Sequence, residues 1–254
     1  MTNLLPPDIQ FGDRIALACF VVAWLGYGSL IQMLHGTPNI TSRMVSIRRE
    51  WMHAMLGRDN RITDASLIGN TIHSNTFFAS TTMIALAALL GMLGRFDATY
   101  ATVAELSFAA KTSRTFVEFK VLLLILVFAH TFLKLTWALR QLNYCVALFG
   151  SAPLAPTPLQ RETMADRLSA VLSLAIGSFN AGIRGYYFAL AAFAWFLGPV
   201  AMLLVTAGML AMLLWRQFGS ATADAIGLSH AAYPGRDAGP QAAPRSGLGD
   251  GYAG

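Results

Sequence analysis

Ile15 to Leu34 read IALACFVVAWLGYGSLIQML, a stretch of twenty residues without a formal charge. A hydrocarbon core of about 30 Å needs about 20 helical residues, each rising about 1.5 Å. The stretch therefore predicts a membrane-spanning helix. Similar apolar runs recur further along the chain. We expect an all-α, polytopic integral membrane protein with four transmembrane helices, over residues 15–34, 72–94, 121–139 and 186–214.

The composition agrees with this class. Apolar residues make up 55% of the chain and charged residues 12%, against roughly 25% charged residues in soluble domains. The net charge of +5 comes from basic residues in loops that flank the apolar runs, where lipid headgroups are the nearest anions. Membrane lipids, and not nucleic acids, are the expected partners. Residues 1–223 form the expected membrane domain, and 224–254 an Ala/Gly/Pro-rich tail that we expect to be disordered.

Two further segments have the periodicity of amphipathic helices, over residues 43–57 and 161–181. In the first, Met44, Ile47, Trp51 and Met55 follow one another at spacings of three and four. This helix lies either on the lipid surface or against the ends of the bundle. In the second, two glycines and an asparagine within 178–185 suit a helix stop.

The last apolar run, 186–214, would measure about 43 Å as one helix, longer than a typical bilayer core. Gly198-Pro199 lies near its middle. We expect one tilted and kinked helix, with a helical hairpin as the alternative. Four crossings place both termini on one side, and the larger number of arginines in the loops after the first and third spans favours termini outside the cytoplasm.

Lys134 is the most unusual polar residue, because a cation near bilayer depth costs at least about 2.5 kcal/mol. His130 lies one helical turn before it, and none of the four runs contains Asp or Glu. Asn70, Ser74 and Thr81 share one face of the second span. Together these residues indicate a polar cavity between spans two and three, and ordinary interhelical hydrogen bonding is the alternative.

A second group of polar residues gathers at one membrane face in this topology. Arg140 and Asn143 follow the third span, Asn180 and Arg184 precede the fourth, and His73 lies near the start of the second. Arginines and amides together could bind a phosphate headgroup or a small anion. Alternatively, the two arginines cap helices and reach toward lipid headgroups. The candidate site residues are Lys134, His130, Arg140, Asn143, Arg184, Asn180, Asn70, His73, Ser74 and Thr81.

The sequence contains no pattern that indicates a cofactor or a metal site. Haem held by two histidines requires both at one depth, whereas His73 and His130 lie at different depths of antiparallel spans. The histidines lack carboxylates that would complete a metal site, and no nucleophile–base–acid arrangement is legible. We therefore expect no cofactor and no metal, and an enzyme is not the favoured class.

Three sequence segments together are similar to those of a known protein family. They are Gly69-Asn70-Thr71 to Ala79-Ser80-Thr81-Thr82, Arg140 to Tyr144, and Phe179 to Phe188. The chain resembles, over about residues 10–220, a family of bacterial and plant membrane proteins known as domain of unknown function 599. The resemblance implies a multi-span architecture but no activity, and we expect a cell membrane, a bacterial inner membrane, as the location.

Two functional hypotheses remain open. The first is an oligomeric channel or transporter-like protein with an anion-favouring polar site between helices, in which Lys134, Arg140 and Arg184 attract the anion. A homo-oligomer follows from it, because four helices are too few to enclose a pathway within one subunit. The second is a non-transporting scaffold or accessory subunit that docks lipids or a membrane partner protein.

Overall fold

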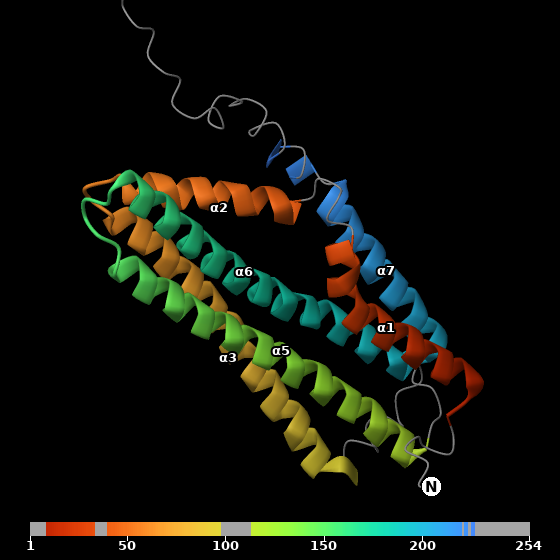
Figure 1. The fold of residues 1–254 in the computed structure, drawn as a ribbon. Helices are drawn as coiled ribbons and strands as arrows, with labels where there is room; N and C mark the ends of the chain where they lie inside the picture. Colours follow the sequence, from red (N-terminus) through yellow and green to blue (C-terminus); the bar gives the residue numbers. More distant parts are fainter. Residues whose placement is uncertain (1–8, 34–39, 98–112, 220, 223–224, 227–254) are drawn as a thin grey trace, which may run out of the picture.

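The computed structural model describes residues 9–33, 40–97, 113–219, 221–222 and 225–226. Within these ranges the chain forms helices and no strand (Figure 1), so the all-α prediction is confirmed. Apart from residues 225 and 226, the tail that we expected to be disordered lies outside the described part. The elements are α1 (Phe11–Met33), α2 (Ile40–Leu56), α3 (Ile62–Gly94), α5 (Arg114–Gly150), α6 (Pro158–Ala194), the short 3₁₀ helix η1 (Trp195–Leu197) and α7 (Pro199–Phe218).

Four helices are long and apolar enough to cross a membrane: α1 over Phe11–Ile31, α3, α5 and α7. The chain is therefore a polytopic membrane protein with four such helices, as the sequence predicts. Two of them are longer than expected, since α3 begins at Ile62 and α5 continues to Gly150. Their polar turns stay helical because they pack on other helices: Asp64, Leu142 and Cys145 are all buried.

Three long helices, α3, α5 and α6, lie side by side and alternate in direction (Figure 1). The most extensive contact is between α5 and α6. It is close because Gly182 and Gly185 of α6 face α5: a Cβ on Gly185 would lie 1.9 Å from Thr131 Oγ1, and one on Gly182 would lie 2.6 Å from Leu135 Cγ. Such small residues let membrane helices approach closely. The two glycines therefore pack a continuous helix instead of ending it.

The chain reverses direction at Trp195–Gly198, after α6. Gly198 has φ 131°, a backbone conformation that L side chains rarely adopt, and Pro199 starts α7 where its missing N–H is not needed. Beyond this turn, α7 runs back so that Arg216 Nη1 donates to Tyr187 Oη of α6 at 3.0 Å. The prediction of one kinked helix over 186–214 is wrong, because the glycine and the proline together close a helical hairpin.

Helices α1 and α7 run in the same direction. The side chain of Trp195 donates to Asp13 near the start of α1 at 2.8 Å, whereas Tyr27 Oη donates to the carbonyl of Leu213, near the end of α7, at 3.5 Å. Phe11 and Phe218 therefore lie toward opposite ends of this helix pair (Figure 1). The expectation that both termini share a side depended on a single last helix, and the hairpin removes that basis.

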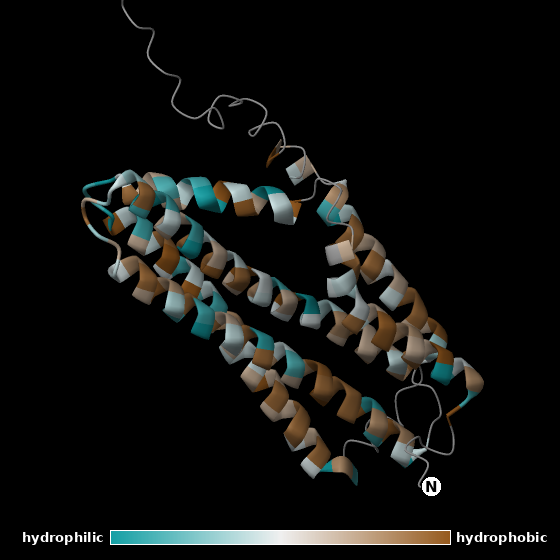
Figure 2. Ribbon diagram, in the orientation of Figure 1, coloured by the Kyte–Doolittle hydropathy of each residue, from teal (hydrophilic) through white to brown (hydrophobic). Residues whose placement is uncertain are grey.

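The described part of the bundle has two large hydrophobic cores and a small third cluster of Phe96, Val117 and Val121. One joins α1, α5, α6 and α7 around Phe20, Phe188 and Trp195. The other joins α2, α5 and α6 around Met52 and Leu168. Figure 2 shows hydrophobic residues concentrated along α1, α7 and the neighbouring parts of α3 and α5, and more hydrophilic residues where α2 lies. We call the end that carries α2 and the start of α6 the α2 end, and the opposite end, with the hairpin turn, the η1 end.

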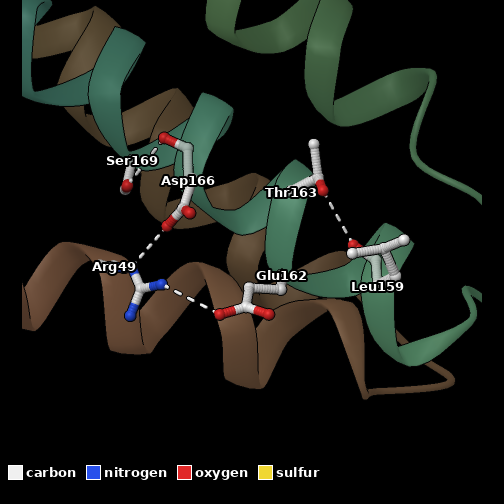
Figure 3. A network of polar contacts seen from close by, with 6 residues as sticks. All are labelled: Arg49, Leu159, Glu162, Thr163, Asp166 and Ser169. Atoms are coloured by element: carbon white, nitrogen blue, oxygen red, sulfur yellow. Dashed lines mark hydrogen bonds and ion pairs between the residues drawn. The ribbon is translucent and has the colours of Figure 1, made fainter.

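Helix α2 packs on α6, not on the lipid surface alone. Arg48 is buried and donates from Nε to Ser173 Oγ at 2.9 Å, and burial lowers the pKa of its guanidinium. Arg49 extends between two carboxylates of α6, those of Asp166 and Glu162 (Figure 3). Of the two placements considered for the 43–57 helix, the structure has the one against the bundle.

A group of hydrogen bonds made by Asp64 and Arg61, which we call the polar elbow, fixes the turn from α2 into α3. The buried carboxylate of Asp64 accepts from Trp51 Nε1 at 2.7 Å and from the Arg58 guanidinium. Arg61 donates to the carbonyls of Leu56, Ala152 and Pro153. These bonds join the α2–α3 turn to the loop between α5 and α6, and so hold the α2 end together.

Candidate oxyanion site

A pocket of about 580 Å³ opens where α1 and α7 end and α2 begins. Four helices surround it: α1 contributes Tyr27, α6 contributes Arg184 and Tyr187, and α7 contributes Arg216, with the start of α2 completing the wall. The pocket exists because of the hairpin, since only the return of α7 along α6 places Arg216 on the same side as Arg184. Two guanidinium groups and two phenol rings therefore share one concave site.

Arg184 is the half-buried cation of this pocket. Its Cζ lies 5.1 Å from the centroid of the Tyr27 ring, a cation–π arrangement. Within the described ranges, it forms no ion pair with a carboxylate and no hydrogen bond. A desolvated guanidinium with its donors unused by protein groups is suited to binding an oxyanion with two parallel hydrogen bonds.

Arg216 lies in the last turn of α7, where a cation interacts favourably with the helix dipole. Its neighbour Gln217 donates from Nε2 to Thr41 Oγ1 at 2.7 Å and thereby holds the start of α2 beside the pocket. Thr41 and Gln217 both line the pocket. The end of α7 is thus fixed on one side by Tyr187 and on the other by α2, which positions Arg216.

The structure brings only two of the predicted site residues into this pocket, Arg184 and Asn180. The other predicted members do not line it. Six of these other members are exposed on the outer faces of α3 and α5, namely Asn70, His73, Ser74, Thr81, Arg140 and Asn143.

The face of α3 that meets its neighbours differs from the predicted one. Besides Asp64 in its first turn, the buried polar residues of α3 are Asn75 and Thr82. Asn75 donates to the Leu135 carbonyl at 3.1 Å, and the Thr82 hydroxyl lies 2.6 Å from that of Tyr186. The predicted face of Asn70, Ser74 and Thr81 points away from the bundle, so those residues do not line a cavity between α3 and α5.

Lys134 and His130 also lie apart from the pocket. The His130 ring packs edge-on against Trp24 of α1, with ring centroids 5.2 Å apart. Lys134 is half-buried one turn away and has no hydrogen bond or ion pair to any residue that the structure describes. His130 therefore joins α1 to α5 by ring packing, and neither residue lines the pocket.

The profile of the family described as "Protein of unknown function, DUF599" matches residues 15–222. The chain belongs to the DUF599 family. No curated protein and no solved structure matches the chain. All residues that line the pocket, from Tyr27 to Thr222, fall within the matched range.

The sequence analysis missed Arg216 in this DUF599 protein because, with four crossings, Arg216 follows the last span and Arg184 precedes it, which puts the two arginines on opposite sides of the membrane. The assignment followed from counting 186–214 as a single crossing. One signal could have corrected it: Gly198-Pro199 offers a residue that tolerates positive φ immediately before a helix-starting proline. A hairpin there would have paired Arg216 with Tyr187 and Arg184.

The DUF599 chain also buries a lysine that the sequence did not single out. Lys120 of α5 is 2% exposed, and its Nζ lies 4.5 Å from the Phe116 ring centroid and 5.6 Å from that of Trp195. Asp13, buried nearby, accepts the Trp195 indole hydrogen bond. This group joins α1, α5 and η1 at the η1 end, where it stabilises the hairpin turn.

We next consider whether side chains in the described part of this DUF599 protein could hold a metal ion. No group of three His, Cys, Asp or Glu side chains there is arranged to hold a metal ion. The polar groups that line the pocket are guanidinium, phenol, hydroxyl and amide groups, which can bind oxyanions.

Proposed function

We propose that this DUF599 protein binds an oxyanion at the membrane boundary, in the pocket between α1, α2, α6 and α7. The observation that carries the proposal is the convergence of Arg184 and Arg216 on one pocket, with Arg184 lacking a carboxylate partner among the described residues. Arg184 is half-buried and Arg216 is exposed at the pocket wall. An anion between them would offset the repulsion of the two guanidiniums, and charge-assisted hydrogen bonds to that anion are worth about 1.5–3 kcal/mol each.

The core beneath the pocket supports binding rather than passage through one subunit. Phe20, Phe188 and Trp195 are almost completely buried between α1, α5 and α6, and Met202 of α7 packs with them. A desolvated anion would gain no hydrogen-bond donor from these side chains, and burying an unpaired charge is costly. The anion therefore enters and leaves from the α2 end.

We also propose that the α2 end faces the cytoplasm. In this arrangement α6 crosses the membrane beside α5, so the helices cross an odd number of times and the end of α7 lies on the cytoplasmic side. Positive residues are enriched in cytoplasmic loops. The α2 end carries Arg43, Arg48, Arg49, Arg58, Arg61, Arg140, Arg161, Arg167, Arg184 and Arg216, whereas the described part of the η1 end carries Arg14, Arg95, Arg114 and Lys120.

Reporter fusions test this orientation. A green fluorescent protein fused after residue 254 should fluoresce, and an alkaline phosphatase fused at the same place should be inactive, because the phosphatase folds only outside the cytoplasm. An active phosphatase with a dark fluorescent protein would contradict the orientation. The location in a bacterial inner membrane is part of the same proposal.

Anion titration in a neutral detergent tests the site. Trp215 lines the pocket and is 62% exposed, so its fluorescence should report binding of inorganic phosphate. Arg184→Gln and Arg216→Gln should each weaken binding about tenfold, which corresponds to about 1.4 kcal/mol. Arg140→Gln is the matched control, because Arg140 is an exposed arginine at the same end outside the pocket. Equal affinities in all four proteins would refute the site.

A second candidate function is an anion pathway shared between copies of the chain. The observation that favours it is the polar outer face of α3, where Asn70, Ser74 and Thr81 are exposed on a helix apolar enough to span the membrane. Polar groups facing lipid are costly unless another helix covers them. Chloride flux in liposomes that disappears when Asn70 and Ser74 are replaced by leucine would support it. Copurification of a stoichiometric partner without flux would favour a scaffold instead.

A further inference from the structure

We infer that the ligand of this pocket is the headgroup of an anionic phospholipid from the leaflet at the α2 end. The inference deepens the proposed oxyanion site and rests on it. Three features of the pocket carry it: its volume, the mixed chemistry of its wall, and its position relative to the apolar part of the bundle.

The pocket is larger than a free inorganic anion needs. Its volume of about 580 Å³ lies within the roughly 300–1,000 Å³ typical of sites for organic ligands. Arg184 and Arg216 occupy only part of the wall, so a phosphate held between them leaves most of the space unfilled. A phosphodiester that carries a glycerol backbone and a polar headgroup would fill that space.

The wall combines polar and apolar groups as an amphiphile requires. Beside the arginines and Asn180 lie Ile183 and Leu213, which present hydrocarbon to the same pocket. A site for a soluble anion has no use for such aliphatic surface. In a lipid site, these side chains would contact the glycerol and the first methylenes of the acyl chains, while the guanidiniums bind the phosphate.

The pocket lies at the end of α1 and α7, two helices apolar enough to cross a membrane, which is where a lipid phosphate would be met. Helices α1 and α7 end beside it, whereas α3, α5 and α6 continue toward the α2 end (Figure 1). Trp215 and Arg216 at the end of α7 form the aromatic and cationic pair that is typical of the membrane interface. Toward the η1 end, α1 and α7 present Leu25 and Leu204, 59% and 69% exposed, to the surrounding lipid. An acyl chain can therefore extend along these helices from a headgroup in the pocket.

Native mass spectrometry of the full chain tests the inference. The protein is reconstituted in bilayers of phosphatidylcholine containing a minor fraction of phosphatidylglycerol, then released in a neutral detergent. We expect retained phosphatidylglycerol on the wild type, about tenfold less on Arg184→Gln and Arg216→Gln, and wild-type retention on Arg140→Gln. Arg184→Lys, which keeps the charge but not the bidentate geometry, should retain an intermediate amount and guards against a folding defect in the glutamine variants.

A second arm separates the two sources of phosphate. Titration with sn-glycerol 3-phosphate in detergent measures binding of the soluble group alone. Arginine-dependent binding of the soluble phosphate without retained phospholipid would overturn the lipid inference and leave the oxyanion site standing. Neither soluble binding nor arginine-dependent lipid retention would overturn both. Retained phosphatidylglycerol that is equal in the wild type and the two pocket glutamine variants would overturn the lipid inference, because the lipid would then be bound elsewhere.

Discussion

Replacing Gly185 with alanine tests the closest helix contact in the bundle. The new Cβ would lie 1.9 Å from Thr131 Oγ1, 3.0 Å from Thr131 Cβ and 3.2 Å from Thr131 Cγ2. Thr131 has little freedom to move away, because it is 1% exposed and its hydroxyl donates to the Val127 carbonyl at 2.8 Å. Overpacking of this kind costs about 1–3 kcal/mol, and the separation of α5 from α6 that relieves it would place the cost at the upper end.

The free energy of unfolding, measured by titrating SDS into mixed micelles and following helical circular dichroism, reads this cost. Gly177→Ala is the matched control: it is on the same helix, a Cβ there meets nothing within 4 Å, and alanine is the better helix former by about 1 kcal/mol. Thr131→Ala should restore most of the stability lost in Gly185→Ala, because it removes the two γ atoms that clash. A Gly185→Ala protein as stable as Gly177→Ala would refute the described α5–α6 packing.

Four further predictions follow from other contacts. Gly198→Ala should destabilise the fold by about 1–3 kcal/mol, because the φ of 131° is strained for any L side chain. Gly208→Ala in α7, where an added Cβ also meets open space, should not destabilise it. Equal melting temperatures of the two variants would contradict the hairpin turn. Asp64→Ala should cost about 1–3 kcal/mol by leaving Trp51 without its acceptor, read from SDS unfolding, and a neutral effect would contradict the elbow. Arg49→Gln should change the same unfolding free energy by less than about 1 kcal/mol, since both partners in its pair with Asp166 are about half exposed; a loss of several kcal/mol would show that this pair holds α2 in place. Lys134→Ala should leave phosphate affinity unchanged while Arg184→Gln lowers it about tenfold, and the reverse order would return the site to the region around Lys134.

The length of the apolar runs and their lack of charged residues were enough to predict that the chain has membrane helices. An uncharged stretch such as Ile15–Leu34 has few alternatives to crossing a bilayer, and α1 and α3 occupy the expected regions. The amphipathic spacing over 43–57 likewise predicted a helix. The spacing alone could not decide whether the apolar face of this helix packs on lipid or on the bundle. The packing of Arg48 on Ser173 decided that question, and no local pattern contains it.

The misassignments came from residues whose role depends on partners distant in the sequence. Gly182 and Gly185 suited a helix stop, but glycine also permits close helix contact, and only Thr131 and Leu135 on α5 distinguish the two roles. The polar residue of α3 that meets α5 also differs from the predicted ones for a similar reason. Asn75 and Asn70 are equally polar, and the position of α5 alone determines that Asn75 is buried.

The candidate site could be predicted only in part. Arg184 and Asn180, which the sequence groups together because they lie one turn apart on a single helix, both line the pocket. Arg216 could not be added from the sequence, because its place beside Arg184 depends on whether Gly198-Pro199 kinks a helix or reverses it. One backbone conformation therefore determined which cations meet.

Cysteine labelling tests the central claim, that the α6–α7 hairpin brings Arg216 and Arg184 to one side of the membrane. Single cysteines at Asn60, Leu197 and Gln217, in a protein whose Cys19 and Cys145 are replaced, are exposed to a membrane-impermeant thiol reagent on sealed vesicles of known orientation. We expect positions 60 and 217 to be labelled from the same side and position 197 from the other. Labelling of 60 and 217 from opposite sides would contradict the hairpin and, with it, the oxyanion site.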